Sequence, residues 1–403
     1  MWLNERARIN FLVRCFLRRG FIFFLMFTVG SLIFINSSFG QEDIFTLGAK
    51  QGDGFLLNPR EVKEGPDGNI YVLDLSYAFI KVFSPTGKFL RRMGGKGQGP
   101  GEIQREEGAY FGFTFDRRLF FTEHYGHRWI TLMELSGKLY KVVHIGMSQS
   151  FGIHKALSLN DGGFILEILL IPKPERRKEY MLHRASILLL RINEEGKVIS
   201  KINKTEYYRG ISSLERGGDQ PIPFSPRIFW DLYNKEENIV FSDSLSTYLK
   251  LLNFNGEEAG QIETKLPEPE KVKQKDFDNW RKRQIKLMKE RDSEWYAQFG
   301  RVIEKYDKSV HKKKPNISSL EITPDGNILI GVPKTANYWL LDYNGRLITR
   351  VFPRGWRLRI TKFFIFFITQ GKDGNYLVQC MPRKGSEEQD LQRLSKVKSL
   401  EGS

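Results

Sequence analysis

The chain has 403 residues, of which 40% are hydrophobic, 13% aromatic and 27% charged, and its formal net charge is +16. This length exceeds one ordinary domain of roughly 100–200 residues, yet a single domain of repeated units also fits it, because repeat architectures grow by adding units. A basic excess attracts nucleic acid, anionic lipid or acidic glycans. No compact Lys/Arg stripe with interleaved aromatics occurs, so we expect no nucleic-acid partner.

The N-terminal segment has the pattern of an export signal. Residues 1–20 are basic, residues 21–35 are almost wholly apolar, and small or polar residues follow at 36–40. This order is typical of a secretory signal, and the apolar run is shorter than the roughly 20 residues that span a bilayer. We therefore predict a signal peptide over residues 1–40 and an exported protein, periplasmic or secreted. The alternative is an uncleaved signal-anchor that keeps the chain at the membrane.

A tight turn between two apolar runs recurs along the rest of the chain. The first copy, Asp67-Gly68, stands between Val62 and a β-rich run that ends at Asp74. Glycine accepts the positive φ that such hairpin turns require. Four copies keep the Asp-Gly pair and two are degenerate; they lie at residues 67–68, 116–117, 161–162, 236–237, 325–326 and 373–374. We interpret them as the first turns of six units.

A second glycine turn follows in most of these units. Gly87, Gly137 and Gly345 lie about nineteen residues after a first turn, and Gly256 and Gly196 take the same role at slightly different offsets. Two turns at a fixed offset define a four-stranded meander. Such meanders bury both faces when they are arranged radially. The sequence therefore predicts an all-β fold, a six-bladed β-propeller of four-stranded blades over residues 41–398, and a monomer.

The last unit is incomplete at its C-terminal end. It lacks a second turn followed by a fourth strand, whereas residues 43–47, directly after the predicted signal, have the pattern of a strand. A free sheet edge invites unwanted pairing. We expect the N-terminal strand to complete the sixth blade and close the ring.

The first unit also resembles a known family. From Val62 through Asp67-Gly68 and Ile80 to Gly87 it is similar to an NHL repeat, and the glycine-rich residues 94–102 resemble the loop that links NHL blades. The resemblance extends over most of residues 43–395 and implies a rigid propeller of the NHL-like type. It is lost at the charged residues 172–184 and at residues 265–315.

Residues 265–315 break the β pattern. Apolar residues there recur at helical spacing, and basic residues lie on the opposite face; the apolar set includes Phe277, Trp280, Leu287, Met288, Phe299 and Tyr306, and the basic set includes Lys275, Arg281, Arg283 and Lys289. We predict a helical insertion between blades 4 and 5 that lays its apolar face on the propeller. The alternative is a basic amphipathic element that meets a partner or a membrane surface.

The candidate site lies in the loops that follow the second strand of each blade, at one end of the central channel. In three units this position is an acid, namely Asp74, Glu123 and Asp243, and His124 follows Glu123. Converging carboxylates suit a hard divalent cation such as calcium, or a basic ligand. Alternatively, each acid accepts hydrogen bonds from the backbone of its own loop, as Asp commonly does in turns. These four residues are the predicted ligand site; no motif predicts a cofactor.

The sequence contains no phosphate-binding Walker loop, no Gly-x-Ser-x-Gly elbow and no His-Glu-x-x-His. Cys380 lies in a strand-like run, where a buried structural cysteine is usual. These features favour an extracytoplasmic binding or scaffolding propeller that recognises an unidentified protein or acidic glycan at the channel mouth, with membrane contact through the N-terminus or the basic helix. The alternative is a metal-dependent hydrolase or lyase, lactonase-like, that uses the loop acids and histidines.

Overall fold

The computed structural model describes residues 44–396, except for 49–51, 77, 98–101, 103–108, 124–127, 148–150, 215–219, 234–237, 292–295, 307–308, 334–336, 353–356 and 371–375. The predicted signal, residues 1–40, lies outside them. The chain divides into two compact units, Met1–Ile44 and Phe45–Ser403, and the elements below belong to the second. Across the described ranges, no helix combines the length and apolarity that crossing a membrane requires.

The described strands form six antiparallel sheets. The first three contain β2 (Pro59–Glu64), β3 (Ile70–Asp74), β4 (Phe79–Phe83) and β5 (Phe89–Gly94); β6 (Ala109–Phe113), β7 (Leu119–Glu123), β8 (Trp129–Met133) and β9 (Leu139–His144); and β10 (Phe151–Ser158), β11 (Phe164–Arg176), β12 (Met181–Ile192), β13 (Val198–Ser212) and β14 (Gln220–Pro221). The other three contain β15 (Phe229–Tyr233), β16 (Asn238–Ser242), β17 (Tyr248–Asn253) and β18 (Glu258–Glu263); β19 (Ser319–Ile322), β20 (Ile328–Val332), β21 (Asn337–Leu341) and β22 (Leu347–Val351); and β23 (Arg357–Ile360), β24 (Phe364–Gln370), β25 (Tyr376–Pro382) and β1 (Phe45–Leu47). We number the sheets one to six in this order.

The first hairpin shows why the predicted turns form. Gly68 adopts φ 77°, and its N–H donates to the carbonyl of Gly65 at 2.9 Å. The Asp67 carboxylate accepts from the Asn69 N–H at 3.2 Å. One backbone and one side-chain hydrogen bond thus stabilise the turn. The β-rich run that follows becomes β3, whose five residues are all buried.

The second-turn glycines allow neighbouring sheets to approach closely. Gly256, at φ 89°, approaches the backbone of Ile202 on β13 so closely that a Cβ atom would collide with it. Gly87 stands in the same relation to β1, where a Cβ would lie 2.8 Å from the Phe45 ring. In both cases the glycine faces the fourth strand of the preceding sheet. The strand β1 therefore takes the place of a fourth strand for sheet six.

Apolar clusters join the faces of neighbouring sheets. Clusters connect sheets one and two through Leu73 and Phe121, sheets two and three through Phe120 and Phe164, sheets three and four through Leu189 and Trp230, sheets four and five through Val240 and Ile330, and sheets six and one through Phe366 and Val72. Sheets five and six meet through Tyr338, whose hydroxyl accepts from the Leu358 N–H at 3.2 Å. Successive meanders that pack in this way form a β-propeller.

The N-terminal strand pairs with the C-terminal sheet. β1 runs antiparallel to β25, with Phe45 opposite Cys380 and Leu47 opposite Val378. The expected pairing is confirmed. The sheet order β1-β25-β24-β23 nevertheless corrects the interpretation of the last Asp-Gly pair, which falls between the second and third strands, not the first and second. The true first strand, β23, was missed because residues 361–363, which end its hairpin, contain no glycine.

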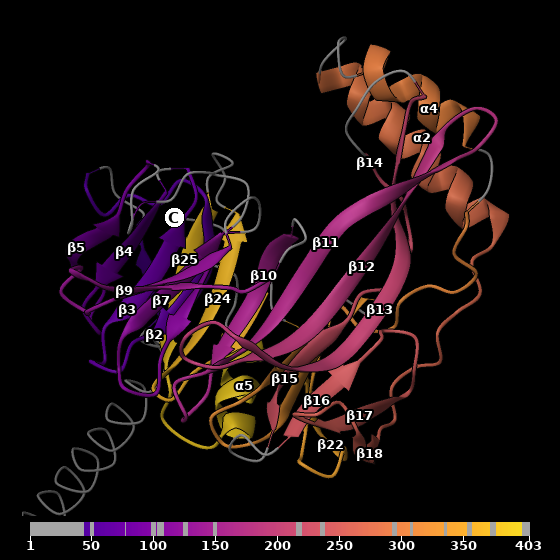
Figure 1. Ribbon diagram of the computed structural model, residues 1–403. Coiled ribbons are helices and arrows are strands. Elements are labelled where there is room, and N and C mark those ends of the chain that lie inside the picture. The colour runs from indigo at the N-terminus through magenta and orange to yellow at the C-terminus, as the bar shows by residue number, and fades with distance from the viewer. Residues whose placement is uncertain are drawn as a thin grey trace, which may run out of the picture. The chain divides into compact units, whose positions relative to one another are not determined.

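Sheet three extends far beyond its neighbours. The charged residues 172–184, where the NHL resemblance is lost, belong to this extension: β11 continues to Arg176 and β12 begins at Met181. The two strands are joined by a hydrogen bond from the Arg177 N–H to the Tyr180 carbonyl at 2.8 Å. Figure 1 shows β11, β12 and β13 running up to the helices α2 (Gln274–Arg291) and α4 (Arg301–Lys305). The π-helix η1 (Tyr296–Gly300) lies between these two helices in the chain. All three helices lie between β18 and β19 in the chain.

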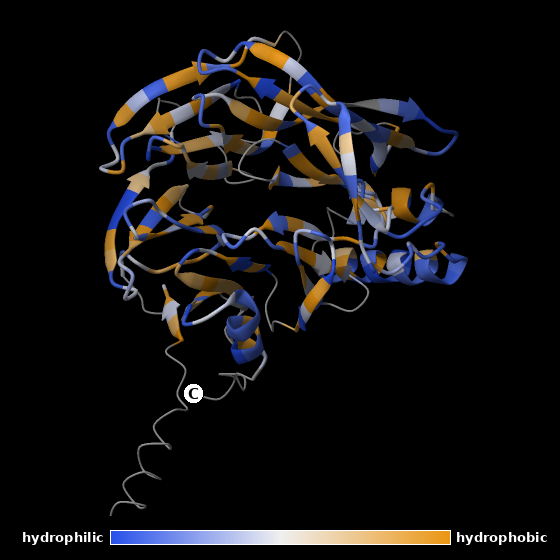
Figure 2. Cartoon of the chain, turned by 90° about the horizontal axis from the view of Figure 1, so that it is seen from below, coloured by the Kyte–Doolittle hydropathy of each residue, from blue (hydrophilic) through white to orange (hydrophobic). Residues whose placement is uncertain are grey.

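The helices pack on the extended strands through their apolar side chains. Phe277 and Tyr306, both fully buried, contact Leu182 on β12 and Ile211 on β13. The opposite face of α2 is charged, and Figure 2 shows this helix coloured mainly as hydrophilic. The apolar stripe of the insertion is thus covered by the chain itself.

A C-terminal helix, α5 (Glu387–Lys396), was not expected from the sequence. The buried carboxylate of Glu387 accepts from the Thr323 hydroxyl at 2.7 Å, from the Asn327 amide at 2.9 Å and from the Asp325 N–H at 3.2 Å. Arg383, just before the helix, pairs with Asp325 at 2.7 Å. The helix thereby attaches to the first turn of sheet five.

Candidate functional site

Two of the four predicted site residues have described side chains, and both accept hydrogen bonds from backbone N–H groups. The buried carboxylate of Asp74 accepts from the backbone N–H groups of Leu57 and Asn58 at 3.1 and 2.9 Å and pairs with Lys81 at 3.2 Å. Asp243 accepts from the Leu245 N–H at 2.9 Å and from the Ser246 hydroxyl at 3.0 Å. The side chain of Glu123, and His124 altogether, lie outside the described residues. Asp243 thus caps the backbone of its own loop, whereas Asp74 caps the backbone of residues 57–58, which precede β2.

Among the described residues, no group of three or more His, Cys, Asp or Glu residues is placed to hold a metal ion. These residues include Asp74 and Asp243, but neither the Glu123 side chain nor His124. The corrected strand order of sheet six also changes which of its residues follows the pattern of Asp74 and Asp243 at the end of the second strand. The residue that ends the second strand there is Gln370 on β24, whereas Cys380 lies in the third strand, buried and opposite Phe366.

A different set of charged residues, together with one tyrosine, gathers on the first strands of the sheets. We call it the first-strand cluster: Glu61 and Lys63 on β2, Tyr110 on β6, Lys155 on β10, Asp231 on β15, Glu321 on β19, and Arg357 and Arg359 on β23. Each residue comes from a strand that opens its sheet. Side chains from six sheets thus meet in one network.

Glu61 is the anionic centre of this cluster. One of its carboxylate oxygens lies 2.7 Å from Arg357 Nη1 and the other 2.7 Å from Arg359 Nη1. Burial alone would raise the pKa of Glu61, but the charges of Arg359, Arg357 and Lys63 outweigh it and lower the pKa. Glu61 is therefore ionised and joins β2 to β23, a strand 296 residues away.

Lys63, two residues further along β2, is a buried lysine whose pKa is lowered. Its side chain is only 13% exposed, and Nζ lies 2.7 Å from the Tyr110 hydroxyl and 3.9 Å from Glu61. Burial, helped by the positive charge of Arg359, lowers the pKa of Lys63 to about 7, against the opposing effect of Glu61. Burial likewise raises the pKa of Tyr110 well above its ordinary value. The pair therefore holds a lysine that is partly neutral near pH 7.

The opposite side of the cluster connects sheets three to six. Arg359 Nε also lies 3.2 Å from Glu321, whose pKa is raised by burial and by the nearby charges of Asp231 and Glu61, although Arg359 opposes this. Asp231 accepts from the Ile322 N–H of sheet five at 2.9 Å, and Lys155 lies 3.9 Å from Asp231. Acids and bases are nearly balanced, so the carboxylates of this cluster are neutralised by the chain itself.

The cluster borders a cavity of about 840 Å³, which we call the large cavity. Its lining includes Glu61, Tyr110, Lys155, Glu321, Arg357 and Arg359 from the cluster, and also His154, Glu167, Tyr207, Arg209, Phe224, Arg227, Phe229 and Tyr338. His154 Nδ1 lies 3.7 Å from Glu167, which also accepts from the Trp230 indole N–H at 2.8 Å. Arg357 is the most open member of the cluster, with a side chain 53% exposed.

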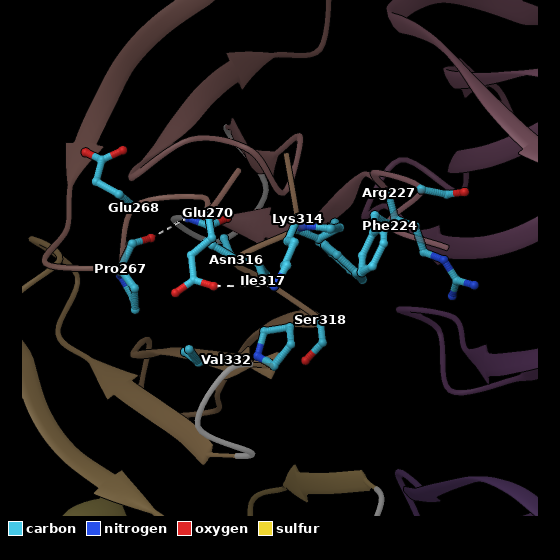
Figure 3. A pocket seen from close by; sticks show the side chains of 14 residues that line it. Phe224, Arg227, Pro267, Glu268, Glu270, Lys314, Asn316, Ile317, Ser318 and Val332 are labelled. Carbon is cyan, nitrogen blue, oxygen red and sulfur yellow. Dashed lines mark hydrogen bonds and ion pairs between the residues drawn. The ribbon is translucent and has the colours of Figure 1, made fainter. Parts of the chain in front are cut away.

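A second pocket of about 490 Å³, which we call the side pocket, lies where the helical insertion leaves and rejoins the sheets. Figure 3 shows Phe224 and Arg227 on one side, Pro267 and Glu268 on the other, and Val332 below. Phe224, Ser225, Arg227, Phe229 and Ser318 line both the side pocket and the large cavity. The two spaces therefore adjoin.

No protein-family model matches the sequence, and neither does any curated protein. Among solved structures, a streptogramin B lyase is similar, at 11% identity and a TM-score of 0.41, over 84% of this chain and 97% of that chain. A calcium-binding regucalcin from Agrobacterium tumefaciens is similar at 10% identity and 0.43, over 82% and 92%. A gluconolactonase from Xanthomonas campestris is similar at 10% and 0.44, over 81% and 87%.

Sequence reasoning chose the loop acids and missed the first strands. A signal for them was present: Lys63 and Glu321 each stand four residues before the Asp of an Asp-Gly turn, and Glu61 and Lys155 stand six residues before one. Charges at fixed distances ahead of the first turn occupy the first strand of each unit. Half-buried strands normally alternate apolar and polar residues, so these charges were indistinguishable from an ordinary solvent-facing set.

Proposed function

We propose that this chain is an extracytoplasmic binding protein, a six-bladed β-propeller whose large cavity holds an acidic saccharide. One observation carries the proposal: cationic side chains from four strands or loops, with several aromatic rings, line the same cavity of about 840 Å³. Such a volume is within the range of about 300–1,000 Å³ common for small-molecule sites.

The chemistry of the lining supports an anionic ligand. Among the described residues, three acids line the cavity. Glu61 and Glu321 are engaged by Arg359. Glu167 lies 3.7 Å from His154 and accepts from the Trp230 indole N–H. Arg357 is half exposed, and Arg227 is exposed with no ion pair among the described residues. Arginine binds carboxylates in a forked geometry, and aromatic rings such as Tyr207 and Tyr338 give a sugar ring a flat apolar face.

The wider arrangement is part of the same proposal. The six sheets would be the blades of one ring over residues 41–398, closed by β1, with residues 265–315 as a helical insertion. Residues 1–40 would direct export as a cleaved signal. The ring would work as a monomer, because its site is built from one chain.

The test is a comparison of acidic and neutral sugars of equal size. Purified chain is titrated with oligosaccharides of a hexuronic acid and with the matching neutral oligosaccharides by calorimetry. We expect binding of the acidic set alone, and a loss of about tenfold or more in affinity on Arg227→Gln or Arg357→Gln, since each removes a charge-assisted contact.

Arg350→Gln is the matched control, because Arg350 is exposed on β22 and stacks on Trp339 outside the cavity. Its affinity should equal that of the wild type. Equal binding of neutral and acidic sugars, or unchanged affinity in both cavity variants, would contradict the proposal. Arg227→Gln keeps the test decisive if Arg357→Gln, which leaves part of Glu61 unpaired, folds poorly.

A further inference from the structure

The side pocket differs from the large cavity in what it offers a ligand. Its walls are mostly apolar, and include Phe229, Pro267, Ile317, Val332 and Pro333. Apolar surface in a pocket favours an apolar occupant by roughly 25 cal/mol for each Å² removed from water. The pocket is therefore not a continuation of the same polar site.

The cationic and amide N–H donors along one wall of the side pocket are already used by the chain, whereas the buried Oδ1 of Asn316 accepts no hydrogen bond from the described residues. The Asn316 amide nitrogen donates to the carbonyls of Ser246 and Pro267 at 2.9 and 3.0 Å. Lys314 pairs with Glu270 at 3.6 Å and with Asp276 at 2.9 Å. Figure 3 shows the contacts of Asn316 with Pro267 and of Glu270 with Lys314 along the pocket wall. These contacts fix the wall, so apart from the Asn316 carbonyl oxygen its apolar side chains are the main binding surface.

Geometry also places the two spaces within reach of one ligand. Five residues line both of them, and Arg227 and Ser318, both exposed, are the polar ones at the junction besides Ser225. A ligand whose acidic group lies among the cations of the large cavity can thus extend past Phe229 into the side pocket.

We propose that the side pocket holds an apolar substituent, an alkyl or acyl chain, carried by the acidic saccharide in the large cavity. The ligand is thus an acidic glycolipid-like amphiphile, and its apolar part determines affinity while its acid determines selectivity. This inference rests on the proposed function of the large cavity.

The experiment compares methyl β-D-glucuronide, octyl β-D-glucuronide and octyl β-D-glucoside, all below the concentration at which micelles form. We expect the octyl glucuronide to bind about tenfold or more tightly than the methyl glucuronide, because the added methylenes are buried. The octyl glucoside, which lacks the acid, should bind more weakly than the octyl glucuronide.

A pocket-filling variant localises the gain. Pro333 is exposed and lines the side pocket alone, so Pro333→Trp should abolish the advantage of the octyl chain and leave the methyl glucuronide unaffected. Pro85→Trp, at an exposed proline in a turn of sheet one, is the control and should behave as wild type.

The outcomes separate the two proposals. Binding of both glucuronides with equal affinity would overturn the apolar subsite and leave the acidic site standing. An octyl advantage that persists in Pro333→Trp would overturn it as well, because the chain would then lie elsewhere. Failure of both glucuronides to bind, with hexuronic acid oligosaccharides also inactive, would remove the proposed function itself.

Discussion

The first-strand cluster and the outer face of α2 carry the same kinds of charged side chain in opposite surroundings. On α2, Lys275, Lys282, Arg283, Lys286 and Lys289 are exposed. The pair Lys286–Glu290 is 3.7 Å apart, with side chains 75% and 57% exposed. In the cluster, Glu61 lies 2.7 Å from two arginines and is 8% exposed.

The comparison teaches that burial and neighbours, and not residue type, determine what a charge does. Exposed ion pairs contribute little because water screens them and side-chain entropy opposes them. Buried charges cost desolvation and depend on their partners, so removing one partner is costly. The cluster should therefore be sensitive to substitution and to pH, whereas the helix face should be sensitive to neither.

Removal of the anionic centre gives the largest expected effect. Glu61→Gln leaves Arg357 and Arg359 without their shared carboxylate, and we expect the free energy of unfolding to fall by about 4 kcal/mol. Urea unfolding followed by circular dichroism measures it. Glu290→Gln on α2 is the matched control and should change stability by less than about 0.5 kcal/mol. Similar losses in both variants would erase the contrast between the two regions.

The apolar face of the insertion should matter more than its charged face. Phe277 is fully buried against sheet three, so Phe277→Ala should cost about 3 kcal/mol through lost burial and a cavity. Native-state hydrogen exchange over α2 and the extended part of β13 would report the loss. If exchange there were unchanged, α2 would not depend on this contact.

The lowered pKa of Lys63 predicts a pH dependence. Its pKa is about 7 in the folded chain against an ordinary 10.5, so between these values the unfolded chain binds more protons and stability rises with pH. Relative to Lys63→Met, the wild type should gain up to about 1.4 kcal/mol per pH unit from pH 7 towards 10.5, and the difference should be flat below pH 7. Urea unfolding at a series of pH values measures this, and Lys282→Met should run parallel to the wild type.

The smallest effect is expected on the outer face of α2. Lys282→Gln, Lys286→Gln and Lys289→Gln should each change the free energy of unfolding by less than about 0.5 kcal/mol, because surface positions without buried contacts tolerate substitution. A loss of more than 1 kcal/mol in any of them, measured by thermal unfolding at low and high salt, would show that this face has a structural role.

Much of the fold could be predicted because its signals are local. The Asp-Gly and second glycine turns require a positive φ or a close approach that glycine alone meets, as at Gly68 and Gly256. One long-range feature was also predicted: because the last unit lacked a fourth strand, the N-terminal strand β1 was expected to pair with β25. Where the local signal was absent, as at the glycine-free hairpin after β23, the prediction was wrong.

The site was decided by tertiary structure. Nothing in the sequence around Glu61 indicates that Arg357, 296 residues later, lies against it. Nor does it indicate that burial, with the charge of Arg359 nearby, lowers the pKa of Lys63. Likewise the spacing of Phe277 and Tyr306 predicted an apolar helical face, but only the fold shows that an extended sheet three covers it. A turn depends on a few adjacent residues, whereas a buried charge network depends on which strands the closed arrangement brings together.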